Sequence, residues 1–373
     1  MDIQMVDLLG QYEKIKSEID TQIGEVIRSS IFVKGGKVNE LEENLKKYLN
    51  VGHVIACGNG TDALQIALMA LGLNEGDEVI TTPFTFVSTL EVLALMKLKP
   101  VLADVDPDNF NIRPELVANC ITDKTKAIIP VHLYGQCANL ESINALAIKH
   151  HLFVIEDACQ ALGTDYIYID GHTAKAGTIG DIASNSFFPT KNLGAFGDGG
   201  ALFTNNNEMA QQMRSIANHG MGKRYYYQQI GMNSRLDAIQ AAILDVKLNY
   251  LDQFVKSRQE AAAFYDRELS GIQEISIPAR VSYSTHSFHQ YTLKVHNKRD
   301  DLQKFLHSKG IPSMIYYPLS LHLQEAYHYL GYKKGDFPVS EELSQQVLSL
   351  PMHTELTDEQ LTYITAAIRE FFI

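Results

Sequence analysis

From residue 53 to residue 157 the chain alternates short apolar runs with segments whose apolar residues recur at helical spacing. The apolar runs predict five strands, at His53–Cys57, Glu78–Thr81, Pro100–Asp104, Ala127–Val131 and Phe153–Asp157. The helical patterns fall between them, at Asp62–Leu71, Val87–Met96 and Leu140–His150. This alternation predicts an α/β fold with a mostly parallel sheet flanked by helices. Since ligands bind at the carboxyl ends of such strands, the residues that follow each apolar run become the candidates for a site.

The pattern changes after residue 233. A long helix-compatible segment, 234–251, continues with a polar interruption toward Leu269. A strand pattern at Gln290–Val295 and helical patterns at Asp300–Ser308 and Asp358–Phe371 follow it. We therefore expect a large domain, 1–249, whose segment 1–50 packs near a smaller α+β domain, 250–373. The segments 164–177 and 331–338 are expected to be loops.

Composition and charge limit the classes of function that we expect for the protein. The formal net charge is -12, which disfavours binding to nucleic acid or to an anionic membrane. No basic region followed by an apolar run opens the chain, and the longest apolar stretch, Ala63–Leu73, is too short to span a bilayer. The four cysteines are far apart, which indicates reduced thiols in a cytoplasmic protein and no metal site.

The segment Gly58–Ala63 follows a predicted strand and opens a predicted helix. A helix terminus of this kind offers unpaired backbone N–H groups to a phosphate. The same string fits the Gly-x-Gly-x-x-Ala fingerprint, which requires an acidic residue at the end of the second strand. Glu78 has the spacing but stands at the start of that strand. We favour the phosphate of another cofactor, and a plain helix cap or a nicotinamide-dependent oxidoreductase remain as alternatives.

Two further residues follow apolar runs. Asp157 stands at the tip of a buried strand, where it either caps the chain or pairs with a protonated ring nitrogen. Lys191 stands five residues after Ser186, and it is either a solvated lysine or a desolvated amine able to form a Schiff base. A phosphate cup, a ring-nitrogen acid and a Schiff-base lysine together describe a site for pyridoxal phosphate.

The motifs that carry this chemistry resemble those of the DegT/DnrJ/EryC1/StrS nucleotide-sugar aminotransferases. They are Gly60–Leu64, Thr85–Thr89, Glu156–Gln160, Ser186–Lys191 and Gly231–Asp237, and the resemblance covers almost the whole chain. It implies a fold-type I enzyme that uses pyridoxal 5'-phosphate, passes through a pyridoxamine form, and works as a homodimer with shared active sites. The Lys at 191 disfavours the family's dehydratases, in which a His replaces it.

The resemblance also assigns roles. Lys191 would carry the Schiff base and be the catalytic residue, and Asp157 would pair with the ring nitrogen. The remaining cofactor contacts would come from Gly60, Thr61, Phe86, Gln160, Ser186 and, from the partner subunit, Asn233. L-glutamate would be the amino donor and a keto-sugar nucleotide the acceptor. Apart from these roles, Tyr225–Tyr227 beside Lys223 and Arg224 could form a stacking strip for nucleic acid, but the net charge of -12 and the nearby segment from the partner subunit favour an interface or a loop that contacts a diphosphate.

Within the family, Met5–Tyr12, Asn233–Ala242 and His289–Thr292 look most similar to UDP-2-acetamido-2-deoxy-3-keto-glucuronate aminotransferases of surface-polysaccharide (O-antigen and lipopolysaccharide) assembly. Arg235 would then bind a carboxylate, although it could also be a helix-surface arginine. The other expected substrate contacts are Ser30, Phe32, Thr190, Tyr316 and Tyr317. The tyrosine pair leaves a dTDP- or UDP-linked 3-keto or 4-keto 6-deoxyhexose as an alternative. A non-catalytic regulatory homologue is the alternative of a different class.

Overall fold

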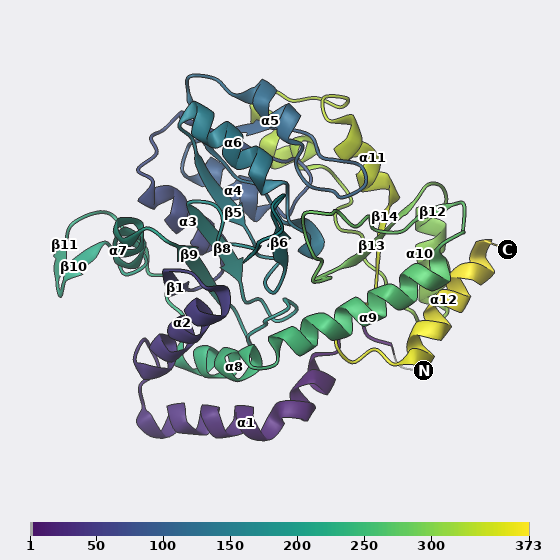
Figure 1. Cartoon of the computed structure of the whole chain (residues 1–373), viewed down its shortest axis with the longest axis horizontal. Helices are drawn as coiled ribbons and strands as arrows, with labels where there is room; N and C mark the ends of the chain where they lie inside the picture. The colour runs from purple at the N-terminus through teal and green to yellow at the C-terminus, as the bar shows by residue number, and fades with distance from the viewer. Residues whose placement is uncertain (1–2, 373) are drawn as a thin grey trace.

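A seven-stranded sheet forms the centre of the computed structural model, which describes residues 3–372 (Figure 1). The strand order is β1-β9-β8-β5-β4-β2-β3. The strands are β1 His53–Cys57, β2 Glu78–Thr81, β3 Lys99–Leu102, β4 Thr125–Ile128, β5 Phe153–Asp157, β8 Ile182–Ser186 and β9 Gly200–Thr204. The neighbours from β8 to β3 are parallel, whereas β9 is antiparallel to both β1 and β8. The predicted mostly parallel sheet is confirmed.

Helices cover both faces of this sheet because its strands alternate their apolar side chains between two clusters. In β1, for example, Ile55 packs on one face and Val54 on the other. The first face is covered by α3 Gly60–Ala70, α4 Ser88–Leu95 and α7 Asn207–Ile216. The second is covered by α2 Gly36–Leu49, α5 Pro114–Cys120, α6 Leu140–His150 and α8 Ala238–Leu248.

A second unit has its own sheet and core. Its sheet orders β12 Ile275–Ser276, β13 Tyr291–Val295 and β14 Val347–Leu350, and α9 Leu251–Leu269, α10 Arg299–Ser308 and α12 Asp358–Phe372 pack around it. The segment between α10 and β14 holds η2 Leu321–Leu323, η3 Glu325–Leu330 and α11 Pro338–Gln346. The start of α9 packs in the core of the first unit and its end packs in the second. The domain boundary after residue 249 stays a prediction.

Several elements differ from the sequence pattern. The segment 164–177, expected as a loop, contains the antiparallel pair β6 Asp165–Ile167 and β7 Thr173–Lys175, because the ring of Tyr166 is buried and anchors it. The expected helix over 234–251 begins at residue 238 and is separated from α9 by Asn249 and Tyr250. The helix α1 Leu8–Ser29 packs along α8, and the short helix η1 Leu133–Gly135 follows β4.

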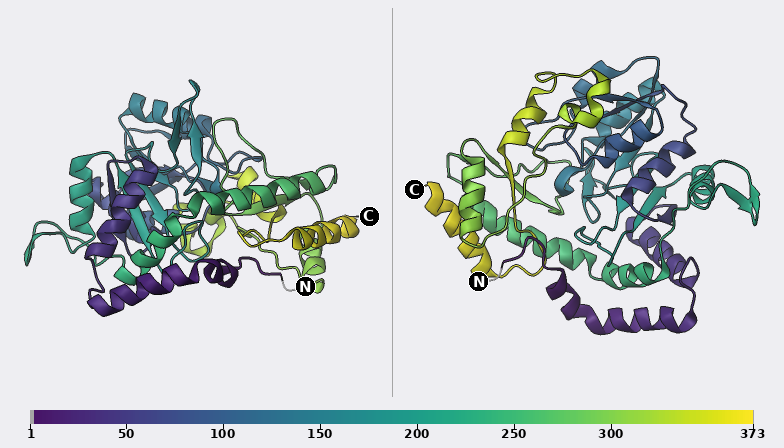
Figure 2. Two further views of the ribbon diagram at one scale, coloured as in Figure 1. Left: turned by 60° about the horizontal axis from the view of Figure 1, so that its bottom comes forward. Right: turned by 180° about the vertical axis from the view of Figure 1, so that it is seen from behind.

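One hairpin stands apart from the layers. It consists of β10 Met221–Lys223 and β11 Tyr226–Tyr227, and Figures 1 and 2 show it projecting from the body of the molecule next to α7. Tyr225, Tyr226 and Tyr227 are all exposed there. Over residues 3–372, no helix combines the length and the apolar character that a bilayer crossing requires.

Candidate active site

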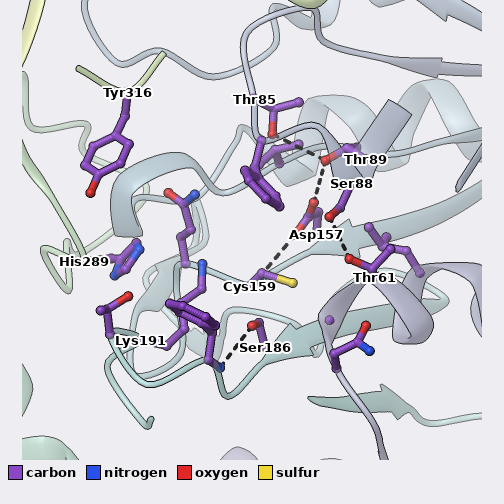
Figure 3. Close-up of a pocket in the computed structure, with 18 of the residues that line it drawn as sticks. Thr61, Thr85, Ser88, Thr89, Asp157, Cys159, Ser186, Lys191, His289 and Tyr316 are labelled. Atoms are coloured by element: carbon purple, nitrogen blue, oxygen red, sulfur yellow. Dashed lines mark hydrogen bonds between the residues drawn. The ribbon is translucent and has the colours of Figure 1, made fainter. Parts of the chain in front are cut away.

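A cavity of about 600 Å³ opens at the carboxyl ends of the central strands (Figure 3). It is lined by ten of the residues singled out from the sequence: Gly60, Thr61, Phe86, Asp157, Gln160, Ser186, Thr190, Lys191, Tyr316 and Tyr317. The other four, Ser30, Phe32, Asn233 and Arg235, do not line the cavity of their own chain. The structure therefore brings together all the expected cofactor residues except Asn233, and it leaves Ser30, Phe32 and Arg235 of the expected substrate set outside.

A narrow cup lies where β1 turns into α3. Asn59 caps the helix, because its Oδ1 accepts the N–H of Asp62 at 2.8 Å. A Cβ at Gly60 would come within 2.8 Å of Ser186 Cβ, so glycine is needed for this close approach. Thr61 Oγ1 lies 2.7 Å from Ser88 Oγ. Ser186 Oγ accepts the N–H of Phe188 at 3.2 Å, which leaves the serine hydroxyl free to donate. The cup has the size and the donors to hold a phosphate.

The carboxylate of Asp157 is buried and held from two sides. Thr89 Oγ1 donates to its Oδ2 at 2.8 Å, and the N–H of Cys159 donates to its Oδ1 at 3.3 Å. Thr89 is fully buried, and Thr85 Oγ1 lies 3.3 Å from its hydroxyl. These contacts fix the orientation of the carboxylate at the cavity wall.

The residue before it, Glu156, anchors the same strand from the opposite face. Its carboxylate is fully buried, lies 2.8 Å from His132 Nε2, and accepts backbone N–H groups from Gly177, Ile179 and Gly180. Burial raises the pKa of Glu156, but the His132 ring and these N–H groups outweigh burial, so the pKa falls below its ordinary value. Glu156 stays ionised and fixes the strand end that carries Asp157.

Lys191 lies across the cavity from Asp157, on the turn that follows β8. Burial lowers the pKa of its amine, and the nearby thiol of Cys159 and carboxylate of Asp157 only partly oppose this. The turn is tight, since a Cβ at Gly194 would come 2.1 Å from the Pro189 carbonyl oxygen. Lys247 of α8 secures it by donating from Nζ to the Gly194 carbonyl at 2.8 Å.

An aromatic wall closes the cavity on the side of the second unit. The rings of Phe86 and Tyr317 are 6.3 Å apart, and Gln160 Nε2 donates to the Tyr317 hydroxyl at 3.3 Å. Tyr134 donates its hydroxyl to the Tyr316 carbonyl. Burial raises the pKa of Tyr317 well above its ordinary value, so its hydroxyl stays protonated.

Among the lining residues that had no role assigned from the sequence are Ser88, Thr89 and His289. The first two belong to a run of hydroxyl residues that follows β2, and that run is the signal that could have found them. His289 lies two residues before β13 and lines the cavity near Lys191. Burial, together with the charges of Lys191 and Arg258, lowers its pKa well below the ordinary value, so the ring is neutral.

The residues left outside form one strip on the molecular surface. Val33 bridges to Asp237, and the N–H of Ala238 donates to the Phe32 carbonyl at 2.8 Å, so the segments that carry Ser30, Phe32 and Arg235 lie side by side. Asn233 is exposed at the start of the same strip. Over the described residues, no group of three or more His, Cys, Asp or Glu side chains is arranged to hold a metal ion.

Comparison with known proteins agrees with this geometry. Residues 13–369 match the model of the DegT/DnrJ/EryC1/StrS aminotransferase family. The chain is 48% identical to a pleiotropic regulatory protein of Geobacillus stearothermophilus, over 100% of this chain and 99% of that protein. It is 43% identical to the UDP-2-acetamido-2-deoxy-3-oxo-D-glucuronate aminotransferase of Pseudomonas aeruginosa, over 98% and 99%. The crystal structure of S. venezuelae DesV in complex with a ketimine intermediate superposes with a TM-score of 0.95 at 35% identity, covering 99% of this chain and 98% of that one.

Proposed function

Because the chain belongs to the DegT/DnrJ/EryC1/StrS aminotransferase family, we propose that it transfers the amino group of L-glutamate to a nucleotide-linked keto-sugar, using pyridoxal phosphate. The chain is an enzyme of the transaminase class. The observation that carries the proposal is one cavity in which Lys191 faces Asp157 beside the Gly60 cup.

The residues of the cavity fit the cofactor. The backbone N–H groups at Gly60 and Thr61 and the free hydroxyl of Ser186 would hold the phosphate. Asp157 would keep the ring nitrogen protonated, and Phe86 would cover one face of the ring. Gln160, whose Oε1 accepts the N–H of Tyr134 at 2.8 Å, would lie near the ring hydroxyl. When bound, the cofactor supplies an electron sink for the carbon that gains or loses a proton.

Lys191 performs the proton transfer in this proposal. Burial lowers the pKa of this amine and so favours its neutral form, in which Nζ can accept the proton from the carbon that bears the amino group of glutamate. The same atom then returns a proton during the second half of the reaction, in which the keto-sugar receives the amino group. A two-stage reaction of this kind has ping-pong kinetics.

For the acceptor we propose UDP-2-acetamido-2-deoxy-3-keto-glucuronate, in the synthesis of a surface polysaccharide. The name of the Pseudomonas aeruginosa relative supports this choice, and the planar guanidinium of Arg235 would suit the uronate carboxylate. Ser30, Phe32, Thr190, Tyr316 and Tyr317 would contact the rest of the substrate. A dTDP- or UDP-linked keto 6-deoxyhexose is the second candidate, since the Tyr316–Tyr317 pair carries no charge toward a uronate.

The proposed assembly is a homodimer with shared active sites. Its support is that Asn233 and Arg235 lie outside the cavity of their own chain. Large apolar side chains are also exposed in the strip that contains them: Ile31, Phe32 and Val33 are each about half exposed, at 54%, 46% and 46%. In an isologous dimer, the strip of one chain would reach the cavity of the other.

A spectroscopic experiment tests the function. Protein that glutamate has converted to the pyridoxamine form is mixed with the UDP-linked 3-keto uronate, and return of the yellow lysine-linked form is recorded. Return of the colour supports this substrate, whereas no return favours the dTDP- or UDP-linked 6-deoxyhexoses as the acceptor. Lys191→Ala protein is the control, and transamination by it at the wild-type rate would refute the proposed role of Lys191. Protein that binds the cofactor but reacts with no donor and no acceptor would favour a regulatory role of the kind named for the Geobacillus stearothermophilus relative.

A further inference from the structure

The cavity has the wrong charge for the substrate that we propose. Its lining contains three aspartates, Asp62, Asp157 and Asp198, and one lysine, Lys191. It would have to accept a phosphorylated cofactor together with a sugar nucleotide whose diphosphate carries two negative charges. Burying anions beside carboxylates is unfavourable unless cations are close by. The missing positive charge must therefore come from outside this lining.

Two unpaired cations lie on the surface strip that holds Arg235. Neither Lys34 nor Arg235 forms an ion pair or a side-chain hydrogen bond with any residue from 3 to 372. Their basic neighbours do have partners: Arg214 pairs with Glu42 at 3.0 Å, and Lys37 lies 3.1 Å from Glu25. In a chain with 44 acidic and 32 basic residues, two adjacent cations without a partner need an explanation.

The backbone brings these two cations together. Val33 bridges to Asp237 in antiparallel register. Lys34, the next residue, therefore lies beside the segment that carries Arg235. Lys34 adopts a left-handed conformation, with φ of 60°, where the chain turns into α2. Partial burial lowers the pKa of Lys34, and the charges of Arg235 and Arg214 lower it further. Asp237 is the one acidic residue in the segments 30–34 and 233–237 that form this strip. The positive charges of Lys34 and Arg235 repel each other, and a bound anion would relieve that repulsion.

We infer that Lys34 is a second cation beside the proposed carboxylate contact of Arg235, and that it binds the diphosphate of the substrate held in the cavity of a second copy. This inference rests on the proposed function and deepens it. An ammonium group is a compact point charge that suits a phosphate, whereas the planar guanidinium suits a carboxylate. Lys34 thus selects for a nucleoside diphosphate, and Arg235 for a uronate.

The first experiment separates Lys34 from its neighbour. In Lys34→Ala protein we expect KM for the sugar nucleotide to rise roughly 10- to 100-fold, as for loss of a charge-assisted hydrogen bond, with the glutamate half-reaction unchanged. Lys37→Ala, which removes a lysine already paired with acids, is the matched control and should leave this KM unchanged. Calorimetry with UDP and with uridine gives a second readout: Lys34→Ala should weaken binding of UDP and leave binding of uridine as it is.

The second experiment tests whether the site is shared between copies. Lys34→Ala and Lys191→Ala chains with different tags are co-expressed, and the mixed dimer is purified. If Lys34 acts in the partner's cavity, one cavity of the mixed dimer is intact and shows the wild-type KM. If Lys34 acts in its own chain, no intact cavity forms and the inference is wrong.

The outcomes for the inference and for the proposed function are distinguishable. If the wild-type protein aminates a keto-sugar nucleotide and Lys34→Ala matches it in KM and in UDP affinity, only the inference is overturned. If the wild-type protein aminates none, the proposed function fails, and the inference fails with it.

Discussion

The hydroxyl of Thr89 gives a direct test of how the Asp157 carboxylate is held. We predict that Thr89→Val destabilises the cofactor-free protein by about 2 kcal/mol, the value of a hydrogen bond to a charged group. The donated bond is 2.8 Å long, and both side chains are buried. Valine has nearly the shape of threonine, and the change therefore removes the donor without leaving a cavity.

The assay is equilibrium unfolding in urea at one fixed protein concentration, since the stability of the proposed homodimer would depend on concentration. Thr85→Val is the matched control. It also removes a buried threonine hydroxyl, but one whose contact is Thr89 Oγ1 at 3.3 Å rather than a carboxylate. This neutral bond is worth only about 0.5–1.5 kcal/mol.

The cofactor provides a second readout for the same pair of variants. An Asp157 that can rotate pairs less well with a ring nitrogen, so Thr89→Val should also bind pyridoxal phosphate more weakly than Thr85→Val does. Equal stabilities for the two variants, or a Thr89→Val protein as stable as the wild type, would refute the reasoning that this hydroxyl fixes the carboxylate.

Two other predictions follow from the same packing. Gly60→Ala should weaken binding of pyridoxal phosphate, measured by equilibrium dialysis, by roughly 5- to 150-fold, because its Cβ would come 2.8 Å from Ser186 Cβ and overpacking costs about 1–3 kcal/mol. Gly36→Ala, whose Cβ would meet its nearest atom at 3.9 Å, should bind normally. Burial, together with the charge of Arg258, lowers the pKa of His353 from 6.5 to about 4. The native state then binds fewer protons than the unfolded state between these two values, so stability should rise with pH across this window, by at most about 3 kcal/mol. His353→Gln should flatten that rise in urea unfolding, whereas a change at the exposed His150 should not.

The sequence predicted the parts of the fold that depend on local periodicity. The strand at 153–157 and the helix at 140–150 were predicted to the residue, because apolar side chains recur there with periods of about 2 and 3.6. The expected loop at 164–177 was wrong because its pairing depends on the burial of Tyr166 in a cluster that includes Cys137 and Leu140. No pattern inside the segment itself reveals such a partner.

The candidate site divides in the same way. Gly60, Asp157 and Lys191 could be found because each follows a strand and belongs to a motif of the resembling family. The contacts that hold them could not, because they join distant parts of the chain, such as Thr89 with Asp157 and Glu156 with His132. These are side-chain contacts across the sheet, and sequence spacing carries no information about them.

The distribution of charge ties this arrangement to assembly. Asp62 lies beside the Gly60 cup, where it accepts a hydrogen bond from Ser234, and Asp157 would pair with the proposed ring nitrogen. The wall of the cavity therefore carries negative charge at the strand ends. A further lysine on this wall, in addition to Lys191, would compete with Ser234 and Thr89 for those carboxylates. Cations on the separate surface strip would not compete for these hydrogen bonds. They would come near the carboxylates only when substrate lies between the two sets of charges. In the proposed homodimer, a second copy would supply the cations for the substrate, so that one chain need not hold them beside its own carboxylates.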